Sequence, residues 1–389
     1  MSIVIFGDSF TFPEGFASTN RVYGYAKGLR ENGVNVRVVC FRNDYREVSD
    51  SEVNQIPYYH PFGQAVRSKS FIRRRFLKFK KYFRTVALLK EIDREDKISE
   101  MLVYTMLFST HLFAWYLSRI YRFKILKECS EHPLGQYQRN FFKKTEGWLK
   151  MKTEMYLSDS IFCISRYLID FYVNQGFPDK RLFLVPSTVD PSRFSQGGEP
   201  PYTFKYIGYF GGLTFTRDNV DALIRAFAII HNNFPDLKLV FGGFYTENEK
   251  YQFDQLVSDL NISSSVIVLN SLKRDEIIRF IVHSHILVMV RSRDLESKAS
   301  FPSKLTEYMA TGKPVITVNV GEISDYLVDN VNSFIVEAGN HKELAQKISF
   351  VIGNYDFALK VAEKGKELTY TTFNYSIQAK RVVEFLREL

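Results

Sequence analysis

Residues 300–316 read SFPSKLTEYMATGKPVI, a loop followed by a helical pattern and an apolar run. Pro302 suits a first helical turn, where its missing N–H costs nothing, and Gly312 follows the last residue of the pattern. The stretch therefore predicts a helix of about three turns and then a buried strand. This alternation is typical of an α/β fold.

The beginning of this helix is a candidate anion site, because free backbone N–H groups and the positive end of the helix dipole stabilise negative charge. Ser303, Lys304 and Leu305 lie there, and Glu307, one turn further along, can accept hydrogen bonds from sugar hydroxyls. A capped surface helix packed on a sheet shows the same pattern. The stretch alone leaves both a binding role and a structural role open.

Length and composition favour two globular domains. The chain has 389 residues, and single cores seldom grow past about 250–300 residues. The beginning, MSIVIFGDSF, is typical of a strand rather than a signal peptide, and no run approaches the roughly 18–20 apolar residues of a membrane span. The three cysteines are far apart and match no disulfide or zinc pattern, so we expect a cytoplasmic protein.

Positive charge is concentrated in residues 67–97, within a chain of net charge +9. A basic, aromatic-rich helix of this kind can be a solvated face or can lie on an anionic membrane, which would make the protein peripheral on the inner membrane face. Nucleic-acid binding is the third of these roles in order of preference, because no recognised RNA- or DNA-binding module accompanies the stretch. Its basic residues are Arg67, Lys69, Arg73, Arg74, Arg75, Lys78, Lys80, Lys81, Arg84, Lys90, Arg94 and Lys97.

The first half begins with a strand, a helix and a strand. Residues 2–6 and 34–41 are apolar runs, and a helical pattern over 19–31 separates them. This order predicts a parallel sheet with a right-handed crossover, whose ligand crevice lies at the carboxyl ends of the strands. The loop at that position, residues 8–15, ends at Gly15 and is not a GxGxxG dinucleotide motif.

The second half shows the same alternation of strands and helices after the linker-like stretch 195–201, SQGGEPP. Its first strand is expected over 204–207, with a glycine-rich turn over 208–212 behind it. We therefore expect two doubly wound, Rossmann-like domains, 1–195 and 200–376, facing across a cleft. A final helix over 377–389 is a candidate to pack back on the first domain.

Polar residues and glycines follow several expected strands. In the first half, Glu131 and His132 follow a strand in KECSEHPLG, where a histidine flanked by carboxylates can be a catalytic residue or a structural hydrogen-bonding group. In the second half, glycines permit close approach of a phosphate or ribose, and basic side chains offer charge to a diphosphate, although such glycines can also simply turn the chain. The second-half candidates are Gly211, Gly212, Arg217, Gly243 and Arg291.

The order of these segments resembles the GT-B glycosyltransferases, specifically the retaining family 4 (glycosyl transferases group 1). The resemblance is carried by YIGYFGGLTFTRDNVDALIRAF, LKLVFGG, FPSKLTEYMATGKPVI and DSIFCIS…LVPSTVDPSRF. It implies a nucleotide-sugar donor held mainly by the second domain and an acceptor held mainly by the first. Gly15 then corresponds to a glycine loop near the donor diphosphate, and His132 or Glu131 to a polar cluster on the acceptor side.

The resemblance also assigns roles near residue 300, with two departures. Glu307 matches the second Glu of the family's Glu-x7-Glu motif, which binds ribose hydroxyls, but Ala299 stands where the first Glu is expected. Glu296 would replace it only after a rearrangement of the loop. Tyr209 stands where the family's phosphate-binding Arg is expected, and Arg217 lies near the position of its Lys.

The implied function is transfer of a sugar from a nucleotide-sugar donor to a glycan or lipid-linked acceptor with retention of anomeric configuration, in bacterial surface polysaccharide synthesis. The donor is a substrate, and neither a cofactor nor a metal ion is expected, since no Asp-x-Asp triplet is present. The departures at Ala299 and Tyr209 keep open a non-catalytic GT-B protein that binds a nucleotide sugar or a partner protein. A nucleic-acid-binding protein would rest on the basic stretch alone.

Overall fold

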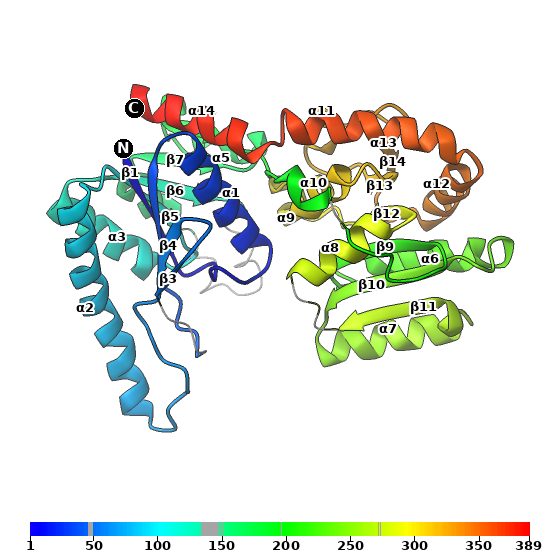
Figure 1. Ribbon diagram of the computed structural model, residues 1–389, viewed down its shortest axis with the longest axis horizontal. Coiled ribbons are helices and arrows are strands. Elements are labelled where there is room, and N and C mark those ends of the chain that lie inside the picture. The colour runs from blue at the N-terminus through cyan, green and yellow to red at the C-terminus, as the bar shows by residue number, and fades with distance from the viewer. Residues whose placement is uncertain (46–49, 134–147, 149–150, 196, 271, 273) are drawn as a thin grey trace. The chain divides into compact units, whose positions relative to one another are not determined.

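The computed structural model describes every residue except 46–49, 134–147, 149–150, 196, 271 and 273. It confirms the α/β class: the described chain forms two compact units, each built around a parallel sheet with helices on both faces (Figure 1). Unit 1 comprises Met1–Pro186 and Tyr375–Leu389, and unit 2 comprises Ser187–Asn374. The linker-like stretch 195–201 lies in unit 2, a few residues beyond the division between the units.

Unit 1 contains an eight-stranded sheet in the order β3-β4-β2-β1-β5-β6-β7-β8, in which only the β3–β4 pair is antiparallel. The strands are β1 Ser2–Gly7, β2 Asn35–Cys40, β3 Ser51–Val53, β4 Ile56–Tyr59, β5 Glu100–Tyr104, β6 Lys124–Cys129, β7 Ser160–Cys163 and β8 Leu182–Leu184. The α-helices whose bounds lie wholly within the described residues are α1 Ala17–Glu31, α2 Phe71–Glu95, α3 Phe108–Tyr121, α5 Arg166–Asn174 and α14 Tyr375–Glu388.

Alternate residues of β1 belong to two separate cores, as the two-residue period of a strand requires. Ile3 and Ile5 face a core that includes side chains of α1 and α14, whereas Val4 and Phe6 face a core that includes α2 and α3. The C-terminal helix α14 therefore packs on unit 1, and the backbone of α1 approaches it so closely that a Cβ at Gly28 would lie 2.7 Å from the Cβ of Ala379.

Unit 2 contains a six-stranded parallel sheet in the order β11-β10-β9-β12-β13-β14. The strands are β9 Tyr206–Gly212, β10 Lys238–Phe244, β11 Val266–Asn270, β12 Ile286–Met289, β13 Val315–Val318 and β14 Phe334–Val336. The α-helices are α6 Val220–Ile230, α7 Glu247–Asp259, α8 Arg274–His283, α9 Leu295–Ala299, α10 Ser303–Ala310, α11 Ile323–Tyr326, α12 His341–Gly353 and α13 Tyr355–Tyr370.

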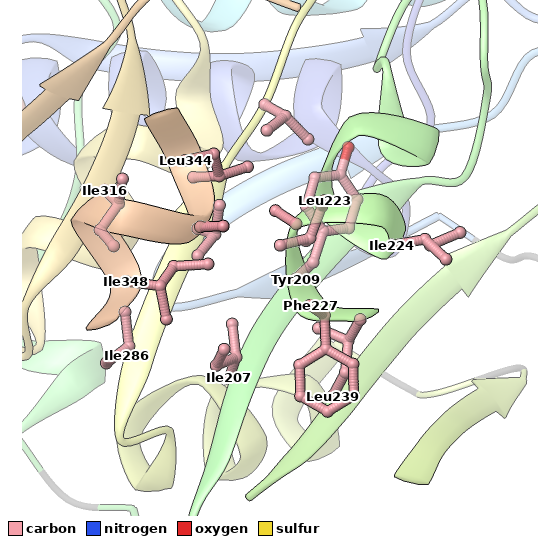
Figure 2. Close-up of a cluster of buried hydrophobic side chains, with 14 of the residues drawn as sticks. Ile207, Tyr209, Leu223, Ile224, Phe227, Leu239, Ile286, Ile316, Leu344 and Ile348 are labelled. Atoms are coloured by element: carbon pink, nitrogen blue, oxygen red, sulfur yellow. The ribbon is translucent and has the colours of Figure 1, made fainter. Parts of the chain in front are cut away.

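One face of this sheet carries an extensive core of unit 2 (Figure 2). Fully buried strand residues such as Ile207 and Ile286 meet Phe227 of α6 and Ile348 of α12. Burying a side chain of this size stabilises a fold by about 1.5–3 kcal/mol. The core therefore fixes β9 and β12, whose carboxyl ends carry the candidate site.

The sequence interpretation of the glycines in unit 2 was wrong in one respect. Gly211 and Gly212 lie in β9 and Gly243 lies in β10, rather than in turns behind shorter strands. The physical reason is the close approach of the paired strands: a Cβ at Gly243 would collide with the carbonyl oxygen of Gly211. Pro302 is likewise the N-cap of α10 rather than its first helical residue, whereas Gly312 has the positive φ of 69° that a helix stop requires.

Cys40, Cys129 and Cys163 are buried free thiols, in line with the absence of a disulfide pattern from their spacing. Among the residues that the model describes, no helix has the length and apolar character needed to cross a membrane.

Candidate functional site

Lys304 is the centre of the candidate site in unit 2. It lies in the first turn of α10, and its Nζ donates to Tyr209 Oη of β9 at 2.6 Å and to Asp218 Oδ1 at 3.1 Å. The ammonium also lies 4.4 Å from the centroid of the Tyr209 ring. A Cβ at Gly211 would lie 2.7 Å from Nζ, so the glycine leaves the space through which this side chain reaches the edge of β9.

The carboxylate of Asp218 is held in place by the loop between β9 and α6. Thr214 Oγ1 donates to Asp218 Oδ2 at 2.8 Å and accepts from the backbone N of Asp218 at 3.0 Å. Burial alone would raise the pKa of Asp218, but the Lys304 charge and the hydrogen bonds outweigh it and lower the pKa. Asp218 is therefore a carboxylate at neutral pH and fixes the direction of Lys304.

Two arginines add positive charge at the same edge. Arg291 follows β12 and is 7% exposed, and its pKa is lowered by burial and by the charge of Arg217. The loops that carry them are tied together, because the backbone N of Ser292 donates to the backbone O of Arg217 at 3.0 Å. The pKa of Lys304 is lowered as well, first by burial and then by Arg291 and Arg217, against the opposing effect of Asp218. The three cations thus lie within reach of one another's fields.

Carboxylates lie close to these cations. Lys304 pairs with Asp218, and Arg217 lies 3.5 Å from Glu296. Asp294 is the N-cap of α9, and its Oδ1 accepts from the backbone N of Ser297 at 2.7 Å. An anionic ligand at this edge would therefore compete with carboxylates for the cations, rather than meet unpaired charge.

Tyr308 joins α10 to β9 behind Lys304. Its hydroxyl accepts from the backbone N of Phe210 at 2.6 Å and donates to the backbone O of Phe210 at 3.1 Å. Burial is the main reason that the pKa of Tyr308 is raised. This pair of hydrogen bonds fixes the last turns of α10 against Phe210 in the glycine-rich half of β9.

The structure gathers most of the donor-binding candidates at this edge: Gly211, Gly212, Arg217, Gly243, Arg291 and Lys304. Glu307 lies one turn along α10 and is partly buried. The backbone O of Ser303 accepts from Thr306 Oγ1 at 2.8 Å. The Leu305 side chain is fully buried, and its backbone N donates to Pro302, so Leu305 contributes to the helix rather than to an exposed surface.

The structure shows the surroundings of the position where the family motif has its first Glu. Ala299 is the last residue of α9 and is fully buried, and its methyl group has no polar atom to offer a sugar. Glu296, the alternative from the sequence, pairs with Arg217. The sequence pattern did not lead to Asp218 and Thr214. An Asp directly after Arg217, at the beginning of a helical pattern, was the signal that could have indicated them.

The remaining candidates lie in unit 1. Gly15 precedes α1, where a Cβ would collide with the side-chain oxygens of Thr19 and Thr11. His132 follows β6, is 3% exposed and packs edge-on against Phe171 at 4.7 Å between ring centroids. Burial lowers the pKa of His132, so its imidazole is neutral at neutral pH. Glu131, beside it, is partly buried.

Glu128, in the same sequence cluster, has a structural role that the sequence did not indicate. Its Oε1 lies 2.5 Å from Nε of Arg21, and its Oε2 accepts from Tyr25 Oη at 2.6 Å. Arg21 also donates to the carbonyl oxygens of Val185 and Pro186 at 2.8 and 3.0 Å. This closed network joins α1, β6 and the segment that follows β8.

A parallel α/β unit with glycines and three cations at the carboxyl edge of its strands has the arrangement of the doubly wound α/β folds, in which the ligand crevice lies at that edge. The family model described as glycosyl transferases group 1 matches residues 194–368, and that of glycosyltransferase family 4 matches residues 18–193. The chain belongs to the group 1 glycosyltransferases, a family of transferase enzymes with the GT-B fold.

Two relatives and two solved structures illustrate this similarity. An uncharacterized glycosyltransferase of Methanocaldococcus jannaschii is 27% identical over 213 residues, 54% of this chain and 55% of that protein. The capsular polysaccharide biosynthesis glycosyltransferase CapM of Staphylococcus aureus is 28% identical over 172 residues, 44% of this chain and 43% of CapM. The match thus spans about half the length of each relative.

The solved structures are similar in fold. Sucrose-phosphate synthase of Thermosynechococcus elongatus superposes with a TM-score of 0.73 at 15% identity, covering 100% of this chain and 98% of that one. Anabaena HepE in complex with UDP superposes with a TM-score of 0.72 at 16% identity, covering 100% of both chains.

Proposed function

We propose that the protein transfers a sugar from a nucleotide-sugar donor to a glycan or lipid-linked acceptor, with retention of anomeric configuration, in bacterial surface polysaccharide synthesis. The observation that carries this proposal is the convergence of Lys304, Arg291 and Arg217 on the glycine-rich carboxyl edge of β9. CapM, by its name, acts in capsular polysaccharide biosynthesis, and HepE has been solved with UDP and with UDP-glucose. CapM supports the choice of pathway class, and HepE supports the choice of a nucleotide-sugar donor.

In the proposed complex, the donor diphosphate lies against the first turn of α10. The free N–H groups of the helix and the Lys304 ammonium bind its oxygens, while Ser303 adds a hydroxyl at the same turn. Gly211, Gly212 and Gly243 let the ligand approach the strand backbone. Glu307 accepts hydrogen bonds from the ribose hydroxyls.

The proposed chemistry separates charge, because the bond from the sugar to the diphosphate breaks. Negative charge develops on the departing nucleoside diphosphate, where Lys304, Arg291 and Arg217 stabilise it electrostatically. The proposal needs no metal ion, since these side chains carry the positive charge. The oxygen of an acceptor hydroxyl forms the new bond to the sugar, and that hydroxyl loses its proton. The neutral imidazole of His132, with Glu131 beside it, is the group that we propose to accept this proton.

A nucleotide-sugar screen tests the function. UDP-, GDP- and ADP-sugars are added one at a time while the unfolding temperature is recorded, since a ligand specific for the native state raises it by mass action. The stabilising donor is then incubated with glycan and lipid-linked acceptors, and the anomeric configuration of the product is determined by NMR. One class of donor should stabilise the protein and support transfer. Inverted product would exclude retention, and stabilisation by none of the donors would exclude the proposed site.

Ala299 favours one second candidate, a non-catalytic protein that binds a nucleotide sugar or a partner protein. Its methyl group is buried where the family carries a carboxylate that contacts the transferred sugar. This candidate predicts stabilisation by a donor without donor hydrolysis or transfer. Transfer above the level of a Lys304→Met variant would exclude it.

A further inference from the structure

Helix α2 of unit 1 carries an apolar stripe that no described residue covers. Ile72, Phe76, Phe79 and Phe83 are 79%, 66%, 66% and 66% exposed. The buried residues of α2 are Lys81, Thr85, Leu89 and Ile92, so none lies in its first ten positions. The N-terminal half of the helix extends beyond the strands of unit 1 (Figure 1).

The stripe is a distinct face of the helix. At about 100° per residue, its four members fall within an arc of about 60°, and the buried residues lie on the opposite side. Arg73, Lys80 and Arg84 flank one side of the stripe, and Arg75 flanks the other. The face of α2 that carries Leu89 and Ile92 packs in the core of unit 1, whereas the stripe does not belong to that core.

The charge around the stripe has one sign. No Asp or Glu occurs between residues 53 and 90, whereas the first fourteen residues of α2 contain seven basic residues. Three consecutive arginines, 73–75, lie within the first five residues of α2, close to the end where the helix dipole disfavours positive charge. Like charges one turn apart also repel. An anionic surface along α2 would offset both effects.

We infer that the α2 stripe docks on an anionic phospholipid bilayer, with the Phe and Ile side chains in the interfacial layer and the flanking Arg and Lys side chains at lipid phosphates. A second copy of the chain fits poorly, because it would bring two sets of like charges together. A nucleic acid would meet the cations but leave the stripe in water. The surface is independent of the proposed transfer reaction, and vesicle binding is measured without a donor.

The test compares co-sedimentation of the full chain with phosphatidylcholine vesicles that contain or lack phosphatidylglycerol. We expect at least about tenfold tighter binding to the anionic vesicles, weakening as salt is added. Phe76→Ser/Phe79→Ser should weaken that binding by about tenfold, because each side chain loses its burial in the interface. The control Ile229→Ser/Tyr251→Ser removes side chains that are 51% and 67% exposed on unit 2, and should bind as the parent does.

Far-ultraviolet circular dichroism and thermal scans establish that the variants fold. Equal binding to neutral and anionic vesicles, or unchanged binding by Phe76→Ser/Phe79→Ser, would overturn the inference. So would self-association in sedimentation velocity that this double variant abolishes, which would identify a second copy as the occupant. Tighter binding to a single-stranded oligonucleotide than to the anionic vesicles would point to nucleic acid instead.

Discussion

Arg21 of unit 1 and Lys304 of unit 2 are both shielded cations paired with a carboxylate, but their surroundings differ. The side chains of Arg21 and Glu128 are 7% and 0% exposed, whereas those of Lys304 and Asp218 are 19% and 16% exposed. Burial opposes the charge in both, yet the pKa of Arg21 is raised because Glu128 outweighs burial, and the pKa of Lys304 is lowered. The first pair is a closed structural element, whereas the second remains partly accessible to solvent.

The largest predicted effect is on the closed pair. Glu128→Gln keeps the shape of the side chain but leaves the Arg21 charge without its counterion, so we expect the free energy of unfolding to fall by about 3–5 kcal/mol. Urea unfolding followed by fluorescence measures the loss. The matched control is Lys97→Met, which removes the exposed Lys97–Asp93 pair and should change stability by less than about 1 kcal/mol. Equal effects of the two variants would contradict the distinction.

Lys81 of unit 1 is a third cation for this comparison. Its ammonium group contacts a backbone carbonyl and aromatic rings. Lys81 Nζ donates to the backbone O of Phe41 at 2.7 Å and lies 3.6 Å from the centroid of the Phe41 ring. Burial lowers the pKa of Lys81 from 10.5 to about 8. Between these values the native state has lost the proton that the unfolded state still binds, so the free energy of unfolding rises with pH across this window.

Lys81→Met tests that assignment. Relative to the variant, the parent should gain about 1–3 kcal/mol between pH 7.5 and pH 10, as its pKa shift implies. Parallel thermal scans of the two proteins over this range measure the difference, and groups common to both cancel. A parent that loses stability relative to Lys81→Met over this interval would show that the sign is wrong.

The smallest effect concerns Asp218. Asp218→Asn removes a carboxylate beside the proposed diphosphate, so we expect UDP to bind about threefold more tightly, within the 0.2–1 kcal/mol typical of partly exposed charge pairs. Calorimetric titration measures the affinity. Asn keeps a hydrogen-bond acceptor for Thr214 or Lys304, which limits local rearrangement. Weaker binding would mean that the orientation of Lys304 by Asp218 matters more than the repulsion.

Local sequence pattern predicted most of the fold. Residues within each segment determine its structure in the apolar runs at 2–6 and 314–318 and in the helix that stops before Gly312. The structure places β1, β13 and α10 there. The glycines of β9 and β10 did not follow local pattern, because the approach of a neighbouring strand decides their place. Residues 195–201 have a linker-like composition, but the two units divide at Pro186–Ser187.

The candidate site was predictable only in part, for the same reason. Lys304 and Glu307 were indicated by the beginning of one helix. The partners of Lys304 come from elsewhere in the chain: Tyr209 is 95 positions away and Asp218 is 86. Arg21 and Glu128 are separated by 107 positions. Pairs of this kind arise from tertiary packing, so residue spacing in the sequence does not indicate them.

The claim that the donor binds at the beginning of α10 is tested most directly by calorimetric titration of UDP into the parent, Lys304→Met and Lys360→Met. Lys360 is an exposed lysine on α13 and controls for the loss of one charge. Loss of a charge-assisted hydrogen bond costs about 1.5–3 kcal/mol, so Lys304→Met should bind UDP at least about tenfold more weakly, while Lys360→Met binds as the parent does. UDP affinity that is the same in all three proteins would contradict the account.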